Sequence, residues 1–224
     1  MSGLFEAKKR YGLSILNYAV TSNHIHLLVV DKPGRNVIPD SIKLIAGRTG
    51  QEYNQRKKRK GAYWEDRYHA TAIQTGEHLA RCLTYIDLNM VRAGAVKHPK
   101  DWEHGGYNEI QNPKKRYRII DHQELMQLFC VLDVIDFASI HRKWVEEALA
   151  GERHKRQSRW TESVAVGDES FVKDLKDGLI GRVRGRQVVE SEGNFELREQ
   201  QVAYHCNMGN DWNLIECLNC YFRG

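Results

Sequence analysis

Asn23-His24-Ile25-His26-Leu27-Leu28-Val29-Val30 is the stretch of sequence that decides the fold. Its second half is apolar and typical of a β-strand, and residues 14–20, Ser-Ile-Leu-Asn-Tyr-Ala-Val, have the same character. Residues 21–23, Thr-Ser-Asn, lie between the two segments and favour a turn. We therefore predict two consecutive strands joined by a hairpin or a strand bend.

The two histidines of this stretch are separated by one residue. Side chains alternate between the two faces of a strand, so His24 and His26 point to the same face while Ile25 points into the core. Two imidazoles a few ångströms apart can bind one metal ion. The pattern is equally compatible with two half-buried polar residues on a solvated sheet face, and the remaining sequence has to distinguish these interpretations.

The composition restricts the class of protein. The 224 residues suffice for one large domain or for one domain with an extension, and 41% hydrophobic with 28% charged residues is ordinary for a globular protein. No apolar run approaches the roughly 18 residues that span a bilayer, and residues 1–10 lack the order of a secretion signal. Five scattered cysteines predict reduced thiols, since Cys217 and Cys220 have no second pair with zinc-site spacing. We expect a cytoplasmic protein without a membrane partner.

The segment 41–60 is strongly basic, with seven Lys or Arg residues against the single acid Glu52. The seven are Lys43, Arg48, Arg56, Lys57, Lys58, Arg59 and Lys60. Tyr63 and Trp64 follow closely, and Arg67 lies just beyond. Basic side chains neutralise phosphates and aromatic faces stack on unpaired bases, so this segment predicts nucleic-acid binding. The alternative is a solvated basic loop whose aromatic residues pack in the core.

Residues 76–94 predict a helix with two distinct faces. A buried stripe at helical spacing consists of Leu79, Leu83, Ile86 and Met90. A polar stripe, with spacings of three and four residues, consists of His78, Arg81, Tyr85, Asn89 and Arg92. Gly94 suits the left-handed position that ends a helix. Tyr85 therefore shares its face with arginines, a histidine and an amide rather than with the leucines.

These elements combine into one chemical hypothesis. Two imidazoles with the amide oxygen of Asn89 form a mixed ligand set for Mg²⁺ or Mn²⁺, with open positions for phosphate oxygens. The Tyr85 hydroxyl would attack the phosphodiester, and Arg81 and Arg92 would hold flanking phosphates. A tyrosine beside such a metal site suggests strand transfer. Two other interpretations stay open: a metal-dependent phosphodiesterase that uses water, with Tyr85 structural, and an inactive nucleic-acid-binding relic.

Three motifs resemble those of the single-tyrosine HUH transposases, in particular the REP-associated tyrosine transposases related to the smallest insertion-sequence transposases. The motifs are residues 22–28 (SNHIHLL), 63–68 (YWEDRY) and 84–94 (TYIDLNMVRAG), and the resemblance covers roughly residues 4–110. It implies that His24 and His26 bind the metal, that Tyr85 is the nucleophile and that Asn89 is the third ligand. The implied reaction is nicking and joining of single-stranded DNA beside a hairpin, with a 5′-phosphotyrosine intermediate and a free 3′-hydroxyl.

The same resemblance implies an α+β fold, a ferredoxin-like antiparallel sheet with packed helices as in HUH endonucleases. Family members open with a further strand that is absent before residue 1, so we expect the sheet to lack its first strand and to be partly unpaired. Residues 1–115 would form the transposase domain, and residues 116–224 a mostly helical extension for auxiliary DNA binding or dimerisation. A homodimer that associates with the nucleoid when bound to DNA is expected.

Ten residues are predicted to contact DNA. They are Arg48, Arg56, Lys57, Lys58, Arg59, Lys60, Trp64, Arg67, Arg81 and Arg92.

Overall fold

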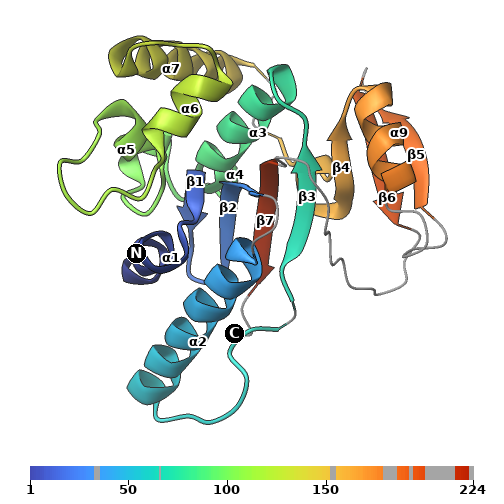
Figure 1. The fold of residues 1–224 in the computed structure, drawn as a ribbon. Coiled ribbons are helices and arrows are strands. Elements are labelled where there is room, and N and C mark those ends of the chain that lie inside the picture. Colours follow the sequence, from blue (N-terminus) through green and yellow to red (C-terminus); the bar gives the residue numbers. More distant parts are fainter. Residues whose placement is uncertain are drawn as a thin grey trace.

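The computed structural model describes residues 1–32, 36–65, 67–151, 155–178, 186–191, 194–199 and 215–221. Within these residues helices pack around one mixed sheet, which confirms the predicted α+β class and is compatible with the HUH-like fold (Figure 1). No helix among the described residues is long and apolar enough to cross a membrane.

Seven strands of the described chain form the sheet, in the order β1-β2-β7-β3-β4-β6-β5. Their bounds are β1 Ser14–Val20, β2 His24–Val30, β3 His69–Ile73, β4 Ser163–Gly167, β5 Arg186–Ser191, β6 Asn194–Glu199 and β7 Ile215–Tyr221. All neighbouring pairs are antiparallel except β3 and β4, which are parallel.

The hairpin predicted from residues 14–30 is confirmed. β1 and β2 pair antiparallel, with Val20 opposite Ile25 at the turn. Thr21 closes the turn through its backbone N–H, which donates to the His24 carbonyl at 3.0 Å, and through Oγ1, which accepts from the His24 backbone N–H at 3.0 Å. The turn thereby fixes the backbone at the point where His24 begins β2.

The expectation that the histidine strand would lack a neighbour is wrong. β7, from near the end of the sequence, lies between β2 and β3 and pairs with β2 along its whole length, from His24 to Val30 (Figure 1). A sheet position can be filled by any segment of the chain that reaches it, because strand pairing depends on backbone hydrogen bonds and not on sequence order. The strand that carries both histidines is therefore paired on both edges.

The helices before the extension are α1 Ser2–Tyr11, α2 Val37–Lys57, α3 Glu77–Asp87, α4 Asn89–Arg92, the 3₁₀ turn Pro99–Asp101 and α5 Tyr107–Gln111. α3 contacts β1, β2 and β3, and it buries the predicted leucine face completely. The single helix expected over residues 76–94 is interrupted at Leu88, and Met90 is only partly buried. Gly94 has a φ of 70°, as expected where the helical segment ends.

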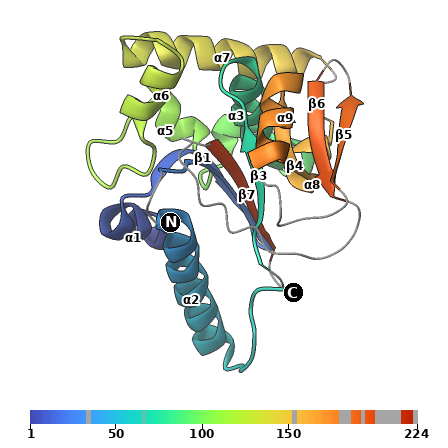
Figure 2. The same ribbon diagram turned by 45° about the vertical axis from the view of Figure 1, so that its right-hand side comes forward.

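α2 extends beyond the body of the protein (Figures 1 and 2). Its buried residues all lie in its first half, from Val37 to Ile45. The second half leads to the basic residues and ends at Lys58, which has a left-handed φ of 50°. The far end of this helix is therefore supported by few tertiary contacts and presents its charges to solvent.

The extension contains α6 His122–Leu128, α7 Val134–Ala150, α8 Arg159–Glu162 and α9 Glu169–Gly178. The mostly helical extension expected over residues 116–224 does contain these helices. The strands β4 to β7 also belong to the extension and continue the same sheet, which the sequence did not predict. The domain boundary near residue 115 stays a prediction. The basic segment 181–185 and Cys206 lie outside the described residues, as do the side chains of Cys217 and Cys220.

Candidate functional site

The two histidines of β2 lie together, as the strand alternation predicted. Their ring centroids are 4.8 Å apart with the planes at 75°. The Nδ1 atom of His24 lies 2.8 Å from Asn23 Oδ1 and 3.0 Å from Thr21 Oγ1. A proton on Nδ1 that is donated to Asn23 leaves the lone pair on Nε2, the arrangement in which a histidine binds a metal through Nε2.

The electrostatic surroundings keep His24 neutral. Burial lowers the pKa of His24, and the charge of Arg92 lowers it as well. The contact with the Asn89 side chain raises this pKa, but the net shift is downward. Only a neutral imidazole has a lone pair for a metal. The lowered pKa therefore favours the ligating form of His24 at neutral pH.

Asn89 is the first residue of α4, and its side chain lies beside His24. Its Oδ1 is buried and makes no hydrogen bond of good geometry among the described residues, although the side chain lies close enough to His24 to raise that residue's pKa. Buried polar oxygens are normally satisfied, so one without a well-formed hydrogen bond is a candidate ligand atom. The described residues contain no group of three or more His, Cys, Asp and Glu side chains that could hold a metal. The candidate set is therefore two imidazoles and one amide oxygen.

Tyr85 lies one turn before Asn89, and Arg92 lies over its ring. The Arg92 Cζ atom is 3.7 Å from the centroid of the Tyr85 ring, within the range of a cation–π contact. The same guanidinium lowers the pKa of His24. Arg92 thus joins the tyrosine to the histidine pair, and the structure brings Tyr85, Asn89, Arg92 and His24 into one site.

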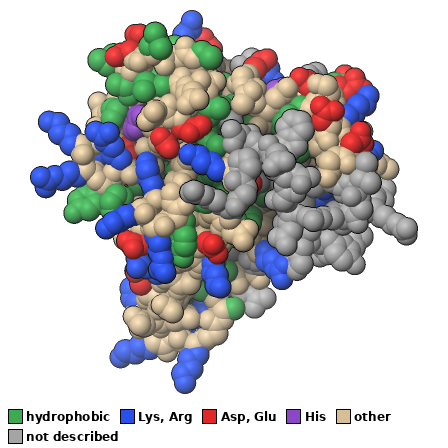
Figure 3. Space-filling view, viewed as in Figure 1, with side chains coloured by type: hydrophobic (Ala, Val, Ile, Leu, Met, Phe, Trp, Pro, Cys, Tyr) green, Lys and Arg blue, Asp and Glu red, His purple; other side chains and the backbone are tan. Residues whose placement is uncertain are grey.

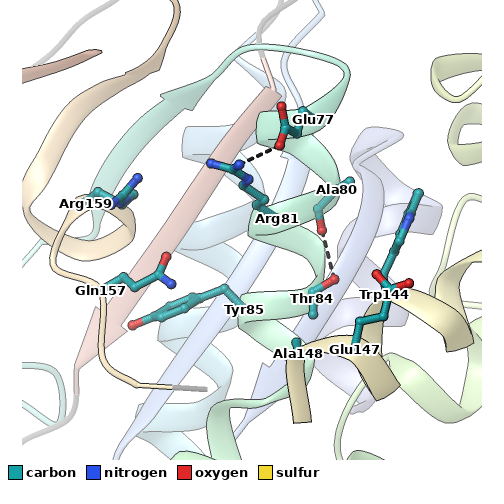
Figure 4. A pocket seen from close by; sticks show the side chains of 10 residues that line it. All are labelled: Glu77, Ala80, Arg81, Thr84, Tyr85, Trp144, Glu147, Ala148, Gln157 and Arg159. Atoms are coloured by element: carbon teal, nitrogen blue, oxygen red, sulfur yellow. Dashed lines mark hydrogen bonds and ion pairs between the residues drawn. The ribbon is translucent and has the colours of Figure 1, made fainter. Parts of the chain in front are cut away.

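A pocket of about 410 Å³ adjoins Tyr85 (Figure 4). Its lining residues are Glu77, Ala80, Arg81, Thr84, Tyr85, Trp144, Glu147, Ala148, Gln157 and Arg159. Residues of α3 lie in the middle of the lining, with residues of α7 on one side and Gln157 and Arg159 on the other (Figure 4). Tyr85 itself is only 7% exposed. The fully buried Trp160 packs near it, with the two ring centroids 6.2 Å apart.

The two arginines of the pocket wall are bound to acidic or amide groups. Arg81 pairs with Glu77 and donates from Nη1 to Asn194 Oδ1 at 3.2 Å. Arg159 lies with its Nε 3.8 Å from Glu196 Oε1. Arg81 therefore lies one turn before Tyr85 on α3, as predicted, and its positive charge is paired with Glu77.

The basic residues predicted to contact DNA gather elsewhere. Arg48 and residues 56–60 lie on the second half of α2 and just after it, and Figure 3 shows Lys and Arg side chains at the tip of the projecting end. Arg56 and Arg59 lie over the ring of Tyr53, at 6.0 and 5.6 Å. Figures 1 and 2 both place this end far from α3. The predicted DNA contacts therefore form two groups, one at Tyr85 and one on α2.

The aromatic residues beside the basic segment are packed. Tyr63 is buried against the ring of Tyr53, with centroids 4.5 Å apart. Trp64 is half-buried and donates from Nε1 to the Ala46 carbonyl at 2.8 Å. Arg67 is exposed. A stacking role for Trp64 stays a prediction, and its packing shows that it also fixes the loop to α2.

A buried polar network connects α3, the helix that carries Tyr85, to β1 and to α7. Asp87, two residues after Tyr85, lies with Oδ2 2.7 Å from His141 Nε2 on α7, and both side chains are fully buried. Asn17 of β1 donates to Asp87 Oδ1 at 3.0 Å and to the Leu83 carbonyl at 3.0 Å. Sequence reasoning missed this network, because no local pattern connects residues 17, 87 and 141.

Comparison with known proteins adds one match. Residues 3–89 match the family model described as "Transposase IS200 like". Neither the curated proteins nor the solved structures contain a match to the chain. The matched segment includes both histidines, Tyr85 and Asn89, and it excludes the residues of the extension that line the pocket. The match supports a function of the transposase type, and it shows that residues 3–89 are similar to the IS200-like transposases.

Proposed function

We propose that this protein nicks and rejoins single-stranded DNA through a covalent bond to Tyr85. In the first step the Tyr85 hydroxyl oxygen attacks the phosphorus of a phosphodiester. The bond between phosphorus and the 3′-oxygen breaks, the tyrosine loses its proton, and the leaving 3′-oxygen takes up a proton. The products are a 5′-phosphotyrosine and a free 3′-hydroxyl. A 3′-hydroxyl can reverse the reaction later, because the phosphotyrosine preserves a diester.

A divalent cation, Mg²⁺ or Mn²⁺, is part of the proposal. His24, His26 and Asn89 would hold it, and the buried Oδ1 of Asn89 beside two adjacent imidazoles fits such an ion. When bound, the cation would polarise the phosphodiester and stabilise charge on its oxygens. Thr21 and Asn23 keep His24 in the orientation that ligation needs.

The observation that carries the proposal is the position of Arg92. Its guanidinium lies 3.7 Å from the Tyr85 ring centroid and acts on the pKa of His24. A cation at this place can hold the phosphate that Tyr85 attacks. The projecting basic end of α2 would bind neighbouring phosphates along the strand. Hairpin DNA as the target, a homodimer as the active form and the nucleoid as the place of action belong to the same proposal.

The test uses a single-stranded oligonucleotide pool in which a hairpin is flanked by randomised bases and the 3′ end is labelled. We expect the label to migrate with the protein on a denaturing gel in the presence of Mn²⁺, because the 3′ fragment carries the phosphotyrosine. Tyr85→Phe should lose the adduct completely, since it lacks the attacking oxygen. Tyr18→Phe is the matched control, because Tyr18 is a buried tyrosine of β1 outside the site.

The other outcomes separate the alternatives. Binding of the pool without cleavage would identify an inactive relic. Cleavage that persists in Tyr85→Phe would contradict the tyrosine mechanism and indicate attack by water.

A further inference from the structure

We propose that the pocket beside Tyr85 binds one unpaired nucleobase of the DNA strand, and that Gln157 of the extension is the residue that hydrogen-bonds to it. The inference rests on the proposed function, because it assigns the ligand of a pocket that adjoins the proposed nucleophile. The family match ends at residue 89, so the wall that Gln157 belongs to lies beyond it.

The shape of the pocket fits a base. Its volume is about 410 Å³, within the range of roughly 300–1,000 Å³ that is usual for sites of small organic ligands. Tyr85 and Trp144 both line the pocket, and Figure 4 shows them on opposite sides of α3, with the Tyr85 ring beside Gln157. Trp144 is held in place by Phe129, with ring centroids 5.1 Å apart. An aromatic side chain such as Trp144 in the lining of a pocket can accept the flat face of an unstacked base.

The charges of the pocket argue against a phosphate as its occupant. Arg81 is paired with Glu77, and Arg159 lies beside the buried carboxylate of Glu196. Glu147 adds a further acid at the rim. A phosphate would have to compete with these carboxylates for the two arginines, whereas a neutral heterocycle leaves both ion pairs intact.

Hydrogen-bonding groups are already oriented for a base. Gln157 Oε1 accepts from Trp160 Nε1 at 2.8 Å, which fixes the amide and leaves the two N–H donors of Nε2 for a ligand. Thr84 donates to the Ala80 carbonyl at 2.9 Å, so its Oγ1 retains acceptor capacity (Figure 4). Donors and acceptors at fixed positions are what distinguishes one base edge from another.

The pocket adjoins Tyr85, so a base bound in it would lie close to the proposed reaction. Trp160 contacts the Tyr85 ring and is hydrogen-bonded to Gln157, so the base contact and the nucleophile share one support. A base seated here would belong to a nucleotide close to the attacked phosphodiester. The extension would thereby contribute to the choice of cleavage position.

The experiment follows the indole N–H signals of Trp144 and Trp160 by NMR, in the full chain without metal. The probes are the neutral nucleosides deoxyadenosine, deoxycytidine and thymidine, with 2-deoxyribose 5-phosphate as the charged control. We expect at least one nucleoside to shift both signals in a saturable manner and the sugar phosphate to shift neither. Trp144→Phe and Trp160→Phe each remove one indole signal and thereby assign the two.

Gln157→Glu is the informative variant, because its carboxylate still accepts from Trp160 while the two donors are lost. We expect nucleoside affinity to fall roughly tenfold, as for the loss of one or two hydrogen bonds. Gln55→Glu, on the exposed part of α2, makes the same charge change outside the pocket and should bind as the parent does. Thermal unfolding establishes that both variants are folded.

The inference is overturned if no nucleoside shifts the indole signals, if the sugar phosphate binds as well as the nucleosides, or if Gln157→Glu binds like the parent. These results do not depend on cleavage. A protein that forms the Tyr85 adduct without nucleoside binding disproves the inference alone, and one that binds nucleosides without nicking DNA disproves the proposed reaction alone.

Discussion

His24 and Asn89 come from different elements, yet they lie side by side at the start of β2. The turn residues Thr21 and Asn23 determine the orientation of the imidazole, and the interruption of the helix at Leu88 places Asn89 at the start of α4. At the scale of single residues, the site therefore depends on one side chain from a strand and one from a helix end.

Removal of one imidazole tests the metal assignment. We expect His24→Ala to abolish cleavage of single-stranded DNA and to leave DNA affinity nearly unchanged, because the basic residues on α2 are far from it. Affinity is measured by fluorescence anisotropy and cleavage on denaturing gels. His104→Ala, at a half-exposed histidine outside the candidate ligand set, serves as the control. Full activity of the His24 variant would refute the assignment.

Asn89 allows a test that does not require activity. Asn89→Leu removes the amide oxygen, and we expect Mn²⁺ to bind at least about tenfold more weakly than to the parent. Asn89→Asp retains an oxygen at the same place and adds a charge, so it should bind Mn²⁺ at least as tightly. Isothermal titration measures both. Equal binding by the Leu variant would show that Asn89 is not a ligand.

At the scale of elements, α3 is held to the extension by the buried pair of Asp87 and His141. The two atoms are 2.7 Å apart, and Asn17 satisfies the second oxygen of Asp87. Gln111 extends the network, with Nε2 3.0 Å from His141 Nδ1. The pair fixes the last turn of α3 against α7, so it also determines the position of Tyr85, the proposed nucleophile.

Loss of this pair should destabilise the fold. His141→Ala leaves the fully buried carboxyl of Asp87 without one partner, and we expect a loss of about 3 kcal/mol in the free energy of unfolding. Urea denaturation provides the measurement. Lys143→Ala, exposed on the same helix, should change the stability by less than about 0.5 kcal/mol. Similar stabilities of the two variants would refute a structural role for the pair.

α9 begins with a capping residue whose charge state sets a pH dependence. Hydrogen bonds from the Gln74 side chain, the Phe171 backbone N–H and the Ser170 hydroxyl lower the pKa of Asp168 to about 2. The folded pKa lies below the unfolded value of about 4, so the carboxylate stabilises the fold above that pH. This contribution is lost as the pH falls towards about 2.

Asp168→Asn should therefore lower the free energy of unfolding by roughly 1 kcal/mol at pH 7, because Gln74 loses its charged acceptor. The difference from the parent should shrink between about pH 4 and pH 2. Thermal unfolding at pH 7, 4 and 3 measures the trend. Asp174→Asn, exposed on the same helix, should show no such trend. A pH-independent difference for Asp168→Asn would contradict the predicted cap.

At the scale of the whole molecule, DNA would meet two separate surfaces. α3 and α4, which carry Tyr85 and Asn89, lie in the upper part of the molecule in Figure 1, and the second half of α2 projects at the bottom. The net charge of +5 is smaller than the local excess on residues 41–60. Long-range attraction of DNA should therefore come mainly from α2, while the chemistry belongs to the other end.

Combined substitution of Arg56, Lys57 and Lys58 by Ala should weaken binding of single-stranded DNA and reduce its salt dependence. For single strands, the slope of log affinity against log salt concentration changes by about 0.7 for each phosphate that the protein no longer neutralises. Loss of three such contacts should therefore change the slope by about 2. Filter binding between 50 and 200 mM salt measures the slope. The triple variant of the exposed residues Lys100, Lys143 and Lys176 makes the same charge change elsewhere. An equal effect of both triple variants would show that only net charge matters.

The sequence by itself determined the local elements. The hairpin, the shared face of the two histidines, the buried leucine face of α3 and the helix stop at Gly94 all follow from short-range periodicity and turn chemistry, and the structure confirms them. The metal ligands and the nucleophile stay predictions, although the structure gathers the residues concerned.

Only the tertiary structure decided how distant segments complete these elements. β7 lies between β2 and β3, Arg92 covers the Tyr85 ring, and Gln157 faces α3 across the pocket. Asp87 and His141 meet although 54 positions separate them in the sequence. Such contacts leave no periodic pattern in either segment, because they depend on which surfaces remain free once the local elements have packed. For this reason the sequence could name candidate residues for the site, and the fold determined what surrounds them.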